Sequence, residues 1–172
     1  RRDKGVASIP EDRIAEGRGV PAISSGFAGC QRLDNPRFVR RGLLDIAAIT
    51  DNARTLIDRF SIRVGGPEFP VGTLSGGNMQ KVVVARELAE QPEGLFVNQP
   101  TRVDLAATQF IWKSITDARD GGAAVLLSSA DLSELLALSD RLVVFCHGRI
   151  VAAFPYDETV TAEMLRAFML GI

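Results

Sequence analysis

The chain contains few of the side chains that bind metal ions or form disulfide frameworks. Its 172 residues include two cysteines, Cys30 and Cys146, and one histidine. Structural zinc sites use about four closely spaced Cys or His ligands, so the sequence argues against one, and we expect no metal site. Two distant cysteines favour reduced thiols in a cytoplasmic protein over a disulfide-rich secreted domain.

Charge and long apolar runs are equally scarce. The formal net charge is -1 at pH 7, which gives no electrostatic basis for binding nucleic acid or an anionic membrane surface. No stretch approaches the roughly 18 apolar residues of a membrane-spanning helix. The sequence opens with neither a signal-peptide pattern nor a methionine. We therefore expect a chain that does not cross a membrane and that is a fragment of something larger, or processed.

A phosphate loop of the form G-x-x-x-x-G-K-S/T is also missing from the printed residues. A different feature suits a phosphate: Ser75-Gly76-Gly77 leads directly into a predicted amphipathic helix that ends near Glu90. Ser75 is a natural N-cap, and glycine amides at a helix N-terminus are open to an anion. Taken alone, the turn has two interpretations, a phosphate site or a capped helix start.

The hydrophobic pattern predicts an α/β protein. Apolar runs predict strands at 6–9, 94–98, 123–128, 141–146 and 149–154, of which the second and third should be buried. Periodicity predicts helices over 36–60, 105–119, 131–138 and 161–170. The inner face of the second should consist of Ala107, Phe110, Ile111, Ile115 and Ala118. We expect mostly loop over 14–35, a hairpin turn at His147-Gly148, and core positions for Met164 and Met169. Strands alternating with helices and followed by a hairpin predict a mostly parallel sheet with antiparallel additions.

Three stretches together resemble the ATP-binding domains of ABC transporters. The run from Leu74 to Gln80 resembles the family signature LSGGQ in the longer form LSGGNxQK. Segments 5–13 and 99–102 resemble the second, C-terminal domain of tandem ATPases that drive simple-sugar and nucleoside importers. The resemblance covers essentially the whole chain. It implies a partial P-loop-NTPase-like sheet with helices and a helical subdomain, truncated before the strand that leads to the phosphate loop.

The resemblance implies a role for each matching position. Glu11 falls at the glutamine loop, Asn98 and Gln99 at the Walker B aspartate and catalytic glutamate, Asp104 at the D-loop aspartate, and Ser129 at the switch histidine. The signature loop, which in this family closes over the γ-phosphate held by an opposite domain, falls at Leu74, Ser75, Gly76, Gly77, Asn78 and Gln80. The implied divisions are a strand and glutamine-loop segment at 1–35, a helical subdomain at 36–73, and the signature helix with the remaining α/β part at 74–172.

Three of these positions depart from the family pattern in the same direction. Asn98 is neutral where magnesium coordination prefers a carboxylate. Gln99 cannot act as a general base, a loss that costs about 10²–10⁴-fold in rate, and Ser129 cannot replace an imidazole. We expect no competent catalytic residue in this half. The family's glycine after Arg102 is absent, which leaves two adjacent placements for the D-loop aspartate.

The resemblance also implies what the parent protein does. It would couple ATP binding and hydrolysis to import of a simple sugar or nucleoside, on the cytoplasmic face of the plasma membrane. ATP with Mg²⁺ is the implied cofactor of the parent assembly, and we expect none bound to this chain. The implied partners are the preceding ATP-binding domain or a second ATPase chain, and membrane permease subunits, with self-association as an option and no nucleic acid. Two alternatives stay open: a regulatory or scaffold domain with an ABC-like fold, and a soluble ABC ATPase outside transport.

Overall fold

The computed structural model describes residues 5–11, 37–40, 42–100, 105–157 and 159–171. The chain divides into two compact units, residues 1–126 and residues 127–172. Each unit has its own buried apolar residues. The expected loop at 14–35 lies outside the described residues. The division into 1–35, 36–73 and 74–172 stays a prediction.

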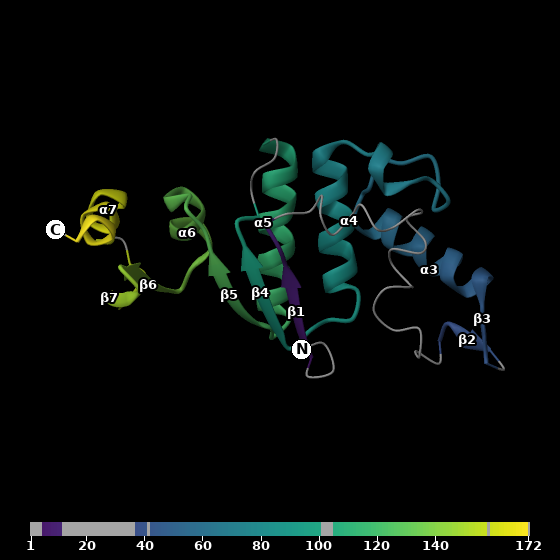
Figure 1. Cartoon of the computed structure of the whole chain (residues 1–172), viewed down its shortest axis with the longest axis horizontal. Helices are drawn as coiled ribbons and strands as arrows, with labels where there is room; N and C mark the ends of the chain where they lie inside the picture. Colours follow the sequence, from purple (N-terminus) through teal and green to yellow (C-terminus); the bar gives the residue numbers. More distant parts are fainter. Residues whose placement is uncertain (1–4, 12–36, 41, 101–104, 158, 172) are drawn as a thin grey trace. The chain divides into compact units, whose positions relative to one another are not determined.

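The first unit contains most of a three-stranded sheet (Figure 1). Its strands are β1 (Val6–Ile9), β4 (Gly94–Asn98) and β5 (Ala124–Ser128), in the order β1-β4-β5. β1 and β4 run parallel, with Ile9 beside Val97, and both of these residues are buried. The predicted parallel α/β sheet is confirmed. Residues that follow β1 and β4 therefore lie at one edge of the sheet.

β5 is less buried than its apolar sequence predicts. We expected a buried strand, but its residues alternate between exposed and half-buried, and Leu126 is 65% exposed. In the described part of the chain, β5 pairs with β4 alone. Apolar composition shows what a strand is able to bury, whereas its position in the sheet decides what it does bury.

The helix predicted from Pro36 to Phe60 is wrong in its first part. A small antiparallel pair of strands stands there instead, β2 (Val39–Arg40) and β3 (Leu43–Leu44). Gly42 between them has a φ of 80°, which glycine adopts without steric cost. α3 (Ile46–Arg59) begins only where Asp45 caps it, with its carboxylate accepting the N–H of Ala48 at 3.0 Å.

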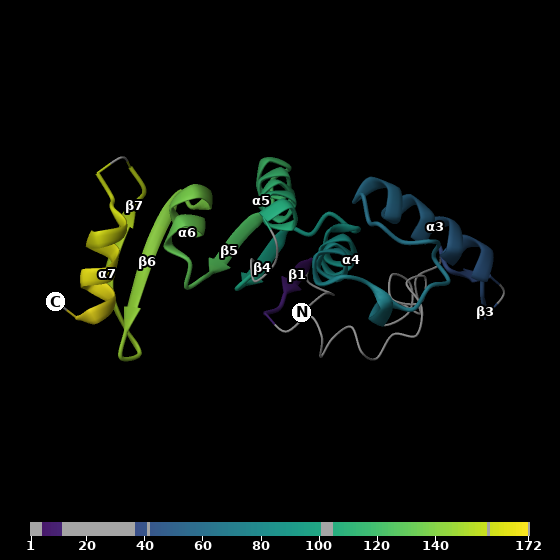
Figure 2. The ribbon, with the colours of Figure 1, turned by 90° about the horizontal axis from the view of Figure 1, so that it is seen from above.

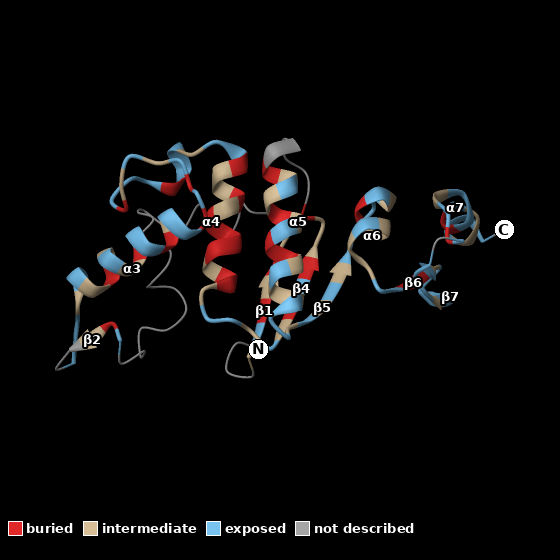
Figure 3. Ribbon diagram, turned by 180° about the vertical axis from the view of Figure 1, so that it is seen from behind, coloured by how far each residue is buried: buried red, intermediate tan, exposed pale blue. Residues whose placement is uncertain are grey.

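α4 (Gly76–Leu88) lies between α3 and α5 in the first unit (Figures 1 and 2). It packs against β1, α3 and α5, and Figure 3 shows that most of it is buried. The prediction of an amphipathic helix was wrong, because a helix covered on most sides has no polar face to offer. Its buried residues are Gly77, Gln80, Val82, Val83, Val84, Ala85, Glu87 and Leu88.

A buried carboxylate ties the end of α4 to the sheet. Glu87 is 4% exposed, and its Oε2 accepts the backbone N–H of Ser8 in β1 at 3.2 Å. Its Oε1 accepts Nε of Arg86 at 3.0 Å. Buried carboxylates are tolerated when they are paired and hydrogen-bonded. α4 is thus anchored to β1 at its C-terminal end.

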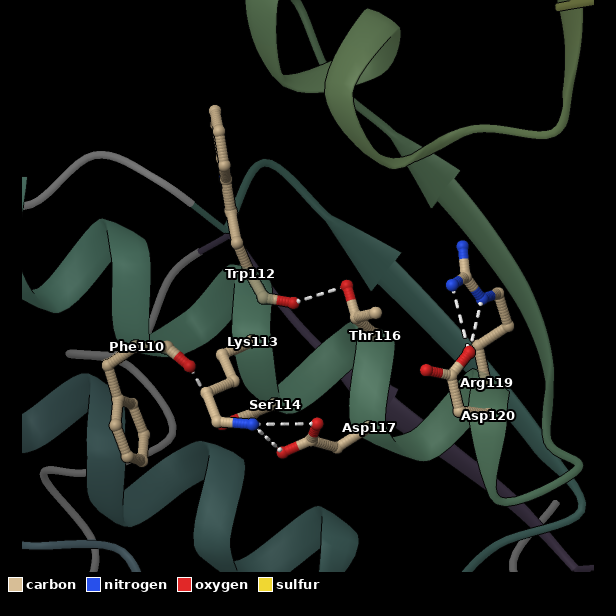
Figure 4. Close-up of polar contacts among 8 residues, drawn as sticks. All are labelled: Phe110, Trp112, Lys113, Ser114, Thr116, Asp117, Arg119 and Asp120. Carbon is tan, nitrogen blue, oxygen red and sulfur yellow. Dashed lines mark hydrogen bonds and ion pairs between the residues drawn. The ribbon is translucent and has the colours of Figure 1, made fainter.

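α5 (Leu105–Asp120) covers the sheet beside α4, and its predicted inner face is confirmed at Ala107, Ile111 and Ile115, which are buried. Figure 4 shows its polar contacts, among them the exposed pair of Lys113 and Asp117 at 2.9 Å. Such exposed pairs contribute little stability, about 0.5 kcal/mol.

The second unit is a hairpin with two short helices. It comprises α6 (Leu132–Leu138), β6 (Arg141–Cys146), β7 (Arg149–Pro155) and α7 (Ala162–Leu170). β6 and β7 are antiparallel, as predicted. His147 and Gly148 both have positive φ, 49° and 75°, as a two-residue hairpin turn requires. The apolar core consists of Leu142, Val144, Val160 and Leu165.

Two predicted core positions in α7 are wrong. Met164 and Met169 are exposed, while Leu165 is buried and Phe168 is half-buried. Leu165 and Phe168 lie three positions apart at the centre of the inward face, and Met164 and Met169 lie at its two margins, each one turn from one of them. No helix in the described ranges is long and apolar enough to span a membrane.

Candidate functional site

The first turn of α4 reaches the surface although most of the helix is buried. Ser75 precedes the helix with an extended backbone and is exposed. Its Oγ accepts the backbone N–H of Asn78 at 3.4 Å and the side-chain Nδ2 of Asn78 at 3.1 Å. The predicted N-cap is confirmed. Both bonds use the oxygen as acceptor, so the hydroxyl proton can still be donated to a ligand.

Gly76 leaves the backbone of this turn open. A Cβ placed on Gly76 would meet no atom within 4 Å. The N–H groups of a first helical turn have no acceptor within the helix, and the helix end carries a partial positive charge. A phosphate group could therefore approach the backbone at Gly76 directly. The turn fits a phosphate, while the role of Leu74 to Gln80 as a signature loop stays a prediction.

Gln80 links α4 to the turn that follows β4. Its side chain is 1% exposed, and its Nε2 donates to the carbonyl oxygen of Pro100 at 3.4 Å. Its Oε1 has no hydrogen-bond partner among the described residues. This buried hydrogen bond from Gln80 to Pro100 helps to fix the position of α4 relative to the segment that follows β4.

Glu11, Asn98 and Gln99 lie at the same edge of the sheet, because β1 and β4 are parallel and in register. Glu11 is exposed and the other two are half-buried. Gln99 has a φ of 48°, a left-handed conformation that residues other than glycine rarely adopt. The structure thus places the predicted glutamine-loop and Walker B positions at one edge of the sheet, and Gln80 reaches the same turn through Pro100.

The donor set at this edge does not match a magnesium site. Asn98 and Gln99 offer neutral amide oxygens, whereas Mg²⁺ in proteins binds mainly through carboxylates and substrate phosphates. Within the described ranges, no three His, Cys, Asp or Glu side chains are grouped to hold a metal ion. The roles of Asn98 and Gln99 as decayed catalytic positions remain predictions.

Two further predicted site positions remain, Ser129 and Asp104. Ser129 belongs to the second unit, where its Oγ accepts the backbone N–H of Asp131 at 3.0 Å. Asp131 in turn caps α6, so the Ser129 hydroxyl serves a local turn. Asp104 lies outside the described residues. The switch and D-loop positions therefore stay predictions.

Sequence reasoning missed the residues that hold the Ser75 turn in place. A glutamate inside the apolar run of α4 is a signal that could have identified Glu87, because a carboxylate is rarely buried unless it is paired. The contact between Gln80 and Pro100 spans 20 residues and has no local signal. The contacts of Lys81 described below likewise depend on tertiary packing.

Known proteins similar to this chain are ATP-binding proteins of bacterial importers. The chain is 36% identical over 170 residues to the nucleoside import ATP-binding protein NupA of Lactococcus lactis, a match covering 98% of this chain and 33% of that protein. It is 37% identical over 171 residues to the ribose import ATP-binding protein RbsA 2 of Rubrobacter xylanophilus, covering 99% of this chain and 32% of that protein. No protein-family model matches the chain.

Solved structures agree with these relatives. The ATP-binding subunit of an ABC transporter superposes with a TM-score of 0.70 at 17% identity, over 97% of this chain and 69% of that one. The chain has the fold of the ABC ATPases. The ABC cassette MJ0796, a dimer in a post-hydrolysis state bound to ADP and Pi, gives a TM-score of 0.65 at 17% identity, over 87% of this chain and 62% of that one. The resemblance to importer ATP-binding proteins drawn from the motifs is confirmed, and the chain spans about a third of the length of the curated relatives it matches.

Proposed function

We propose that this ABC chain is part of the ATP-binding protein of an importer for a simple sugar or a nucleoside. In this role, residues Leu74 to Gln80 supply a signature loop to an ATP site whose phosphate loop belongs to another domain. That domain is either the preceding ATP-binding domain of the same parent or a second ATPase chain. The relatives named for nucleoside and ribose import support the substrate class.

The open backbone at Gly76 carries this proposal. Ser75 and Gly76 are both exposed, and a Cβ at Gly76 would meet nothing within 4 Å. Behind them, α4 is buried and fixed to the sheet by Glu87 and to the turn after β4 by Gln80. A rigid helix that presents bare donors is suited to stabilise phosphate charge without reorganising.

This half is proposed to be catalytically silent. The neutral amides of Asn98 and Gln99 supply neither a magnesium carboxylate nor a general base. ATP and Mg²⁺ would be bound chiefly by the opposing domain, whose phosphate loop and carboxylates supply the metal and base chemistry. Ser75, Gly76 and Gly77 would contact the γ-phosphate from this side.

The parent assembly would include membrane permease subunits, with this chain peripheral on the cytoplasmic face of the plasma membrane. Residues 36–73 would be its helical subdomain. The position of Glu11, exposed after β1, suits a glutamine-loop residue that faces a permease subunit. Self-association of this chain remains an option under the same proposal.

Uptake by cells tests the importer role. Cells that lack the parent protein should lose import of one radiolabelled simple sugar or nucleoside, and the wild-type parent gene should restore it. A parent carrying Gly76→Val should not restore import, while one carrying Gly72→Val should, because Gly72 also faces open space but lies outside the signature. Unchanged uptake of a full panel of sugars and nucleosides in the deletion strain would favour a scaffold or a non-transport ATPase.

A further inference from the structure

Lys81 follows the proposed signature loop, yet its ammonium group is engaged inside the first unit. Its Nζ donates to the carbonyl oxygen of Ser61 at 2.9 Å. The same nitrogen lies 4.6 Å from the centre of the Phe110 ring. A cation over an aromatic face is attracted by the ring quadrupole. One side chain of α4 thus touches both the end of α3 and the first part of α5.

A second contact ties α4 to the segment that follows α3. Asn78 lies three residues before Lys81, on the same face of α4. Its Oδ1 accepts the backbone N–H of Arg63 at 2.9 Å, and its Nδ2 donates to the Ser75 hydroxyl. Residues 61–63 are therefore held at two points by the first two turns of α4, and one of these points also holds the cap of the Ser75 turn.

The end of α3 is built to receive these contacts. Ser61 has a φ of 49°, and its N–H and that of Ile62 donate to the carbonyls of Asp58 and Ile57. This pattern closes the helix and turns the chain away from it. The Ser61 carbonyl lies past the last helical turn, so it accepts Lys81 without breaking a helical hydrogen bond.

Aromatic rings extend the contact. Phe60, the C-cap residue of α3, meets Phe110 edge-on, with ring centres 6.3 Å apart and an interplanar angle of 68°. Arg59 lies 5.2 Å from the centre of the Phe60 ring. Phe110 is itself held in α5, where its carbonyl accepts the Ser114 hydroxyl at 2.9 Å (Figure 4). α3, α4 and α5 meet at this cluster.

We propose that Lys81 is a positioning residue that fixes the Ser75 turn by locking α4 to the end of α3 and to α5. It acts through Ser61 and Phe110 and not as a phosphate ligand. Six residues separate it from Ser75, about 9 Å along a helix axis. The expected effect of Lys81 on hydrolysis rests on the proposed function. The packing of Lys81 against Ser61 and Phe110 does not depend on that proposal.

The test is a double-mutant cycle on the full-length parent protein. Lys81→Met should lower the kcat of ATP hydrolysis about 10-fold, because small displacements of a catalytic group are costly, and should change KM by less than about 2-fold. Phe110→Leu should lower kcat less. The double variant should be no slower than Lys81→Met alone, because both changes break one contact. Lys113→Met, which removes only an exposed pair on α5, is the control and should match wild type.

Three results would overturn the proposal. If the effects of Lys81→Met and Phe110→Leu on kcat multiply, the two residues act independently and share no positioning contact. If KM for ATP rises several-fold, Lys81 acts on the nucleotide. If Lys81→Met matches the Lys113→Met control, it positions nothing. The same double-mutant cycle can be measured without ATP, by thermal unfolding of the 172-residue chain. Coupling between the effects of Lys81→Met and Phe110→Leu on stability supports the contact even if the parent is not an ATPase. One pair of results would separate the two proposals. If Gly76→Val abolishes hydrolysis while the effects of Lys81→Met and Phe110→Leu are additive, the positioning role of Lys81 is wrong and the proposed function is still supported.

Discussion

Replacing Gly76 with valine is expected to lower ATP hydrolysis by the full-length parent protein about 100-fold, while leaving this chain folded. A Cβ at Gly76 would have nothing within 4 Å, so this chain has room for the valine side chain. It would occupy the space through which a phosphate reaches the first-turn amides. Removing one preorganised hydrogen-bond donor that stabilises charge in the transition state lowers the rate about 10²–10³-fold. Steady-state hydrolysis measured alongside circular dichroism separates the loss of activity from unfolding.

Gly72 supplies the matched control for this experiment. It also faces open space, and neither glycine has a positive φ that a side chain would strain. It lies in the short helical turn Val71–Thr73, before Ser75. Gly72→Val should therefore keep normal hydrolysis. Normal hydrolysis in Gly76→Val as well would mean that the Ser75 turn contacts no nucleotide.

Replacing Glu87 with alanine is expected to destabilise the chain by about 3 kcal/mol, the loss typical when one partner of a buried ion pair is removed. The backbone N–H of Ser8 and Nε of Arg86 would each lose an acceptor. Arg86 is itself largely buried, with a side chain that is 9% exposed. Urea unfolding followed by circular dichroism measures the change.

Glu90 is the control for Glu87. It lies on the exposed surface just after α4, and Glu90→Ala should change stability by less than about 0.5 kcal/mol. Glu87→Gln should fall between these two variants, because an amide oxygen keeps one acceptor but loses the charge. Equal stability of Glu87→Ala and Glu90→Ala would show that the contact with β1 is not what anchors α4.

The sequence predicted those elements whose pattern is local. β1 and β4, the inner face of α5, the hairpin turn at His147 and the cap at Ser75 all follow from spacing and side-chain chemistry within a few residues. Three of the failures share one cause. The exposure of β5, the burial of α4 on most sides and the exposure of Met164 depend on which elements lie beside them, and spacing along one element does not encode its neighbours.

The candidate site divides in the same way. Ser75 and Gly76 could be found from the sequence because a cap and a bare backbone are local properties. The supports behind them could not, since Gln80 reaches Pro100 across 20 residues and Lys81 reaches Ser61 across 20. Between 39 and 44, a glycine with positive φ and the cap at Asp45 outweighed a helical pattern that had been extended too far upstream.

A nucleotide titration followed by NMR tests the central claim most directly. With the isotope-labelled chain alone, Mg²⁺-ATP should leave the amide resonances of Gly76 and Gly77 unshifted, because one open helix end holds a triphosphate only weakly. Adding an unlabelled ABC domain with an intact phosphate loop, from the parent protein, should make both resonances shift with ATP. Shifts of equal size without that domain, or none in its presence, would contradict a signature that acts on another domain's nucleotide.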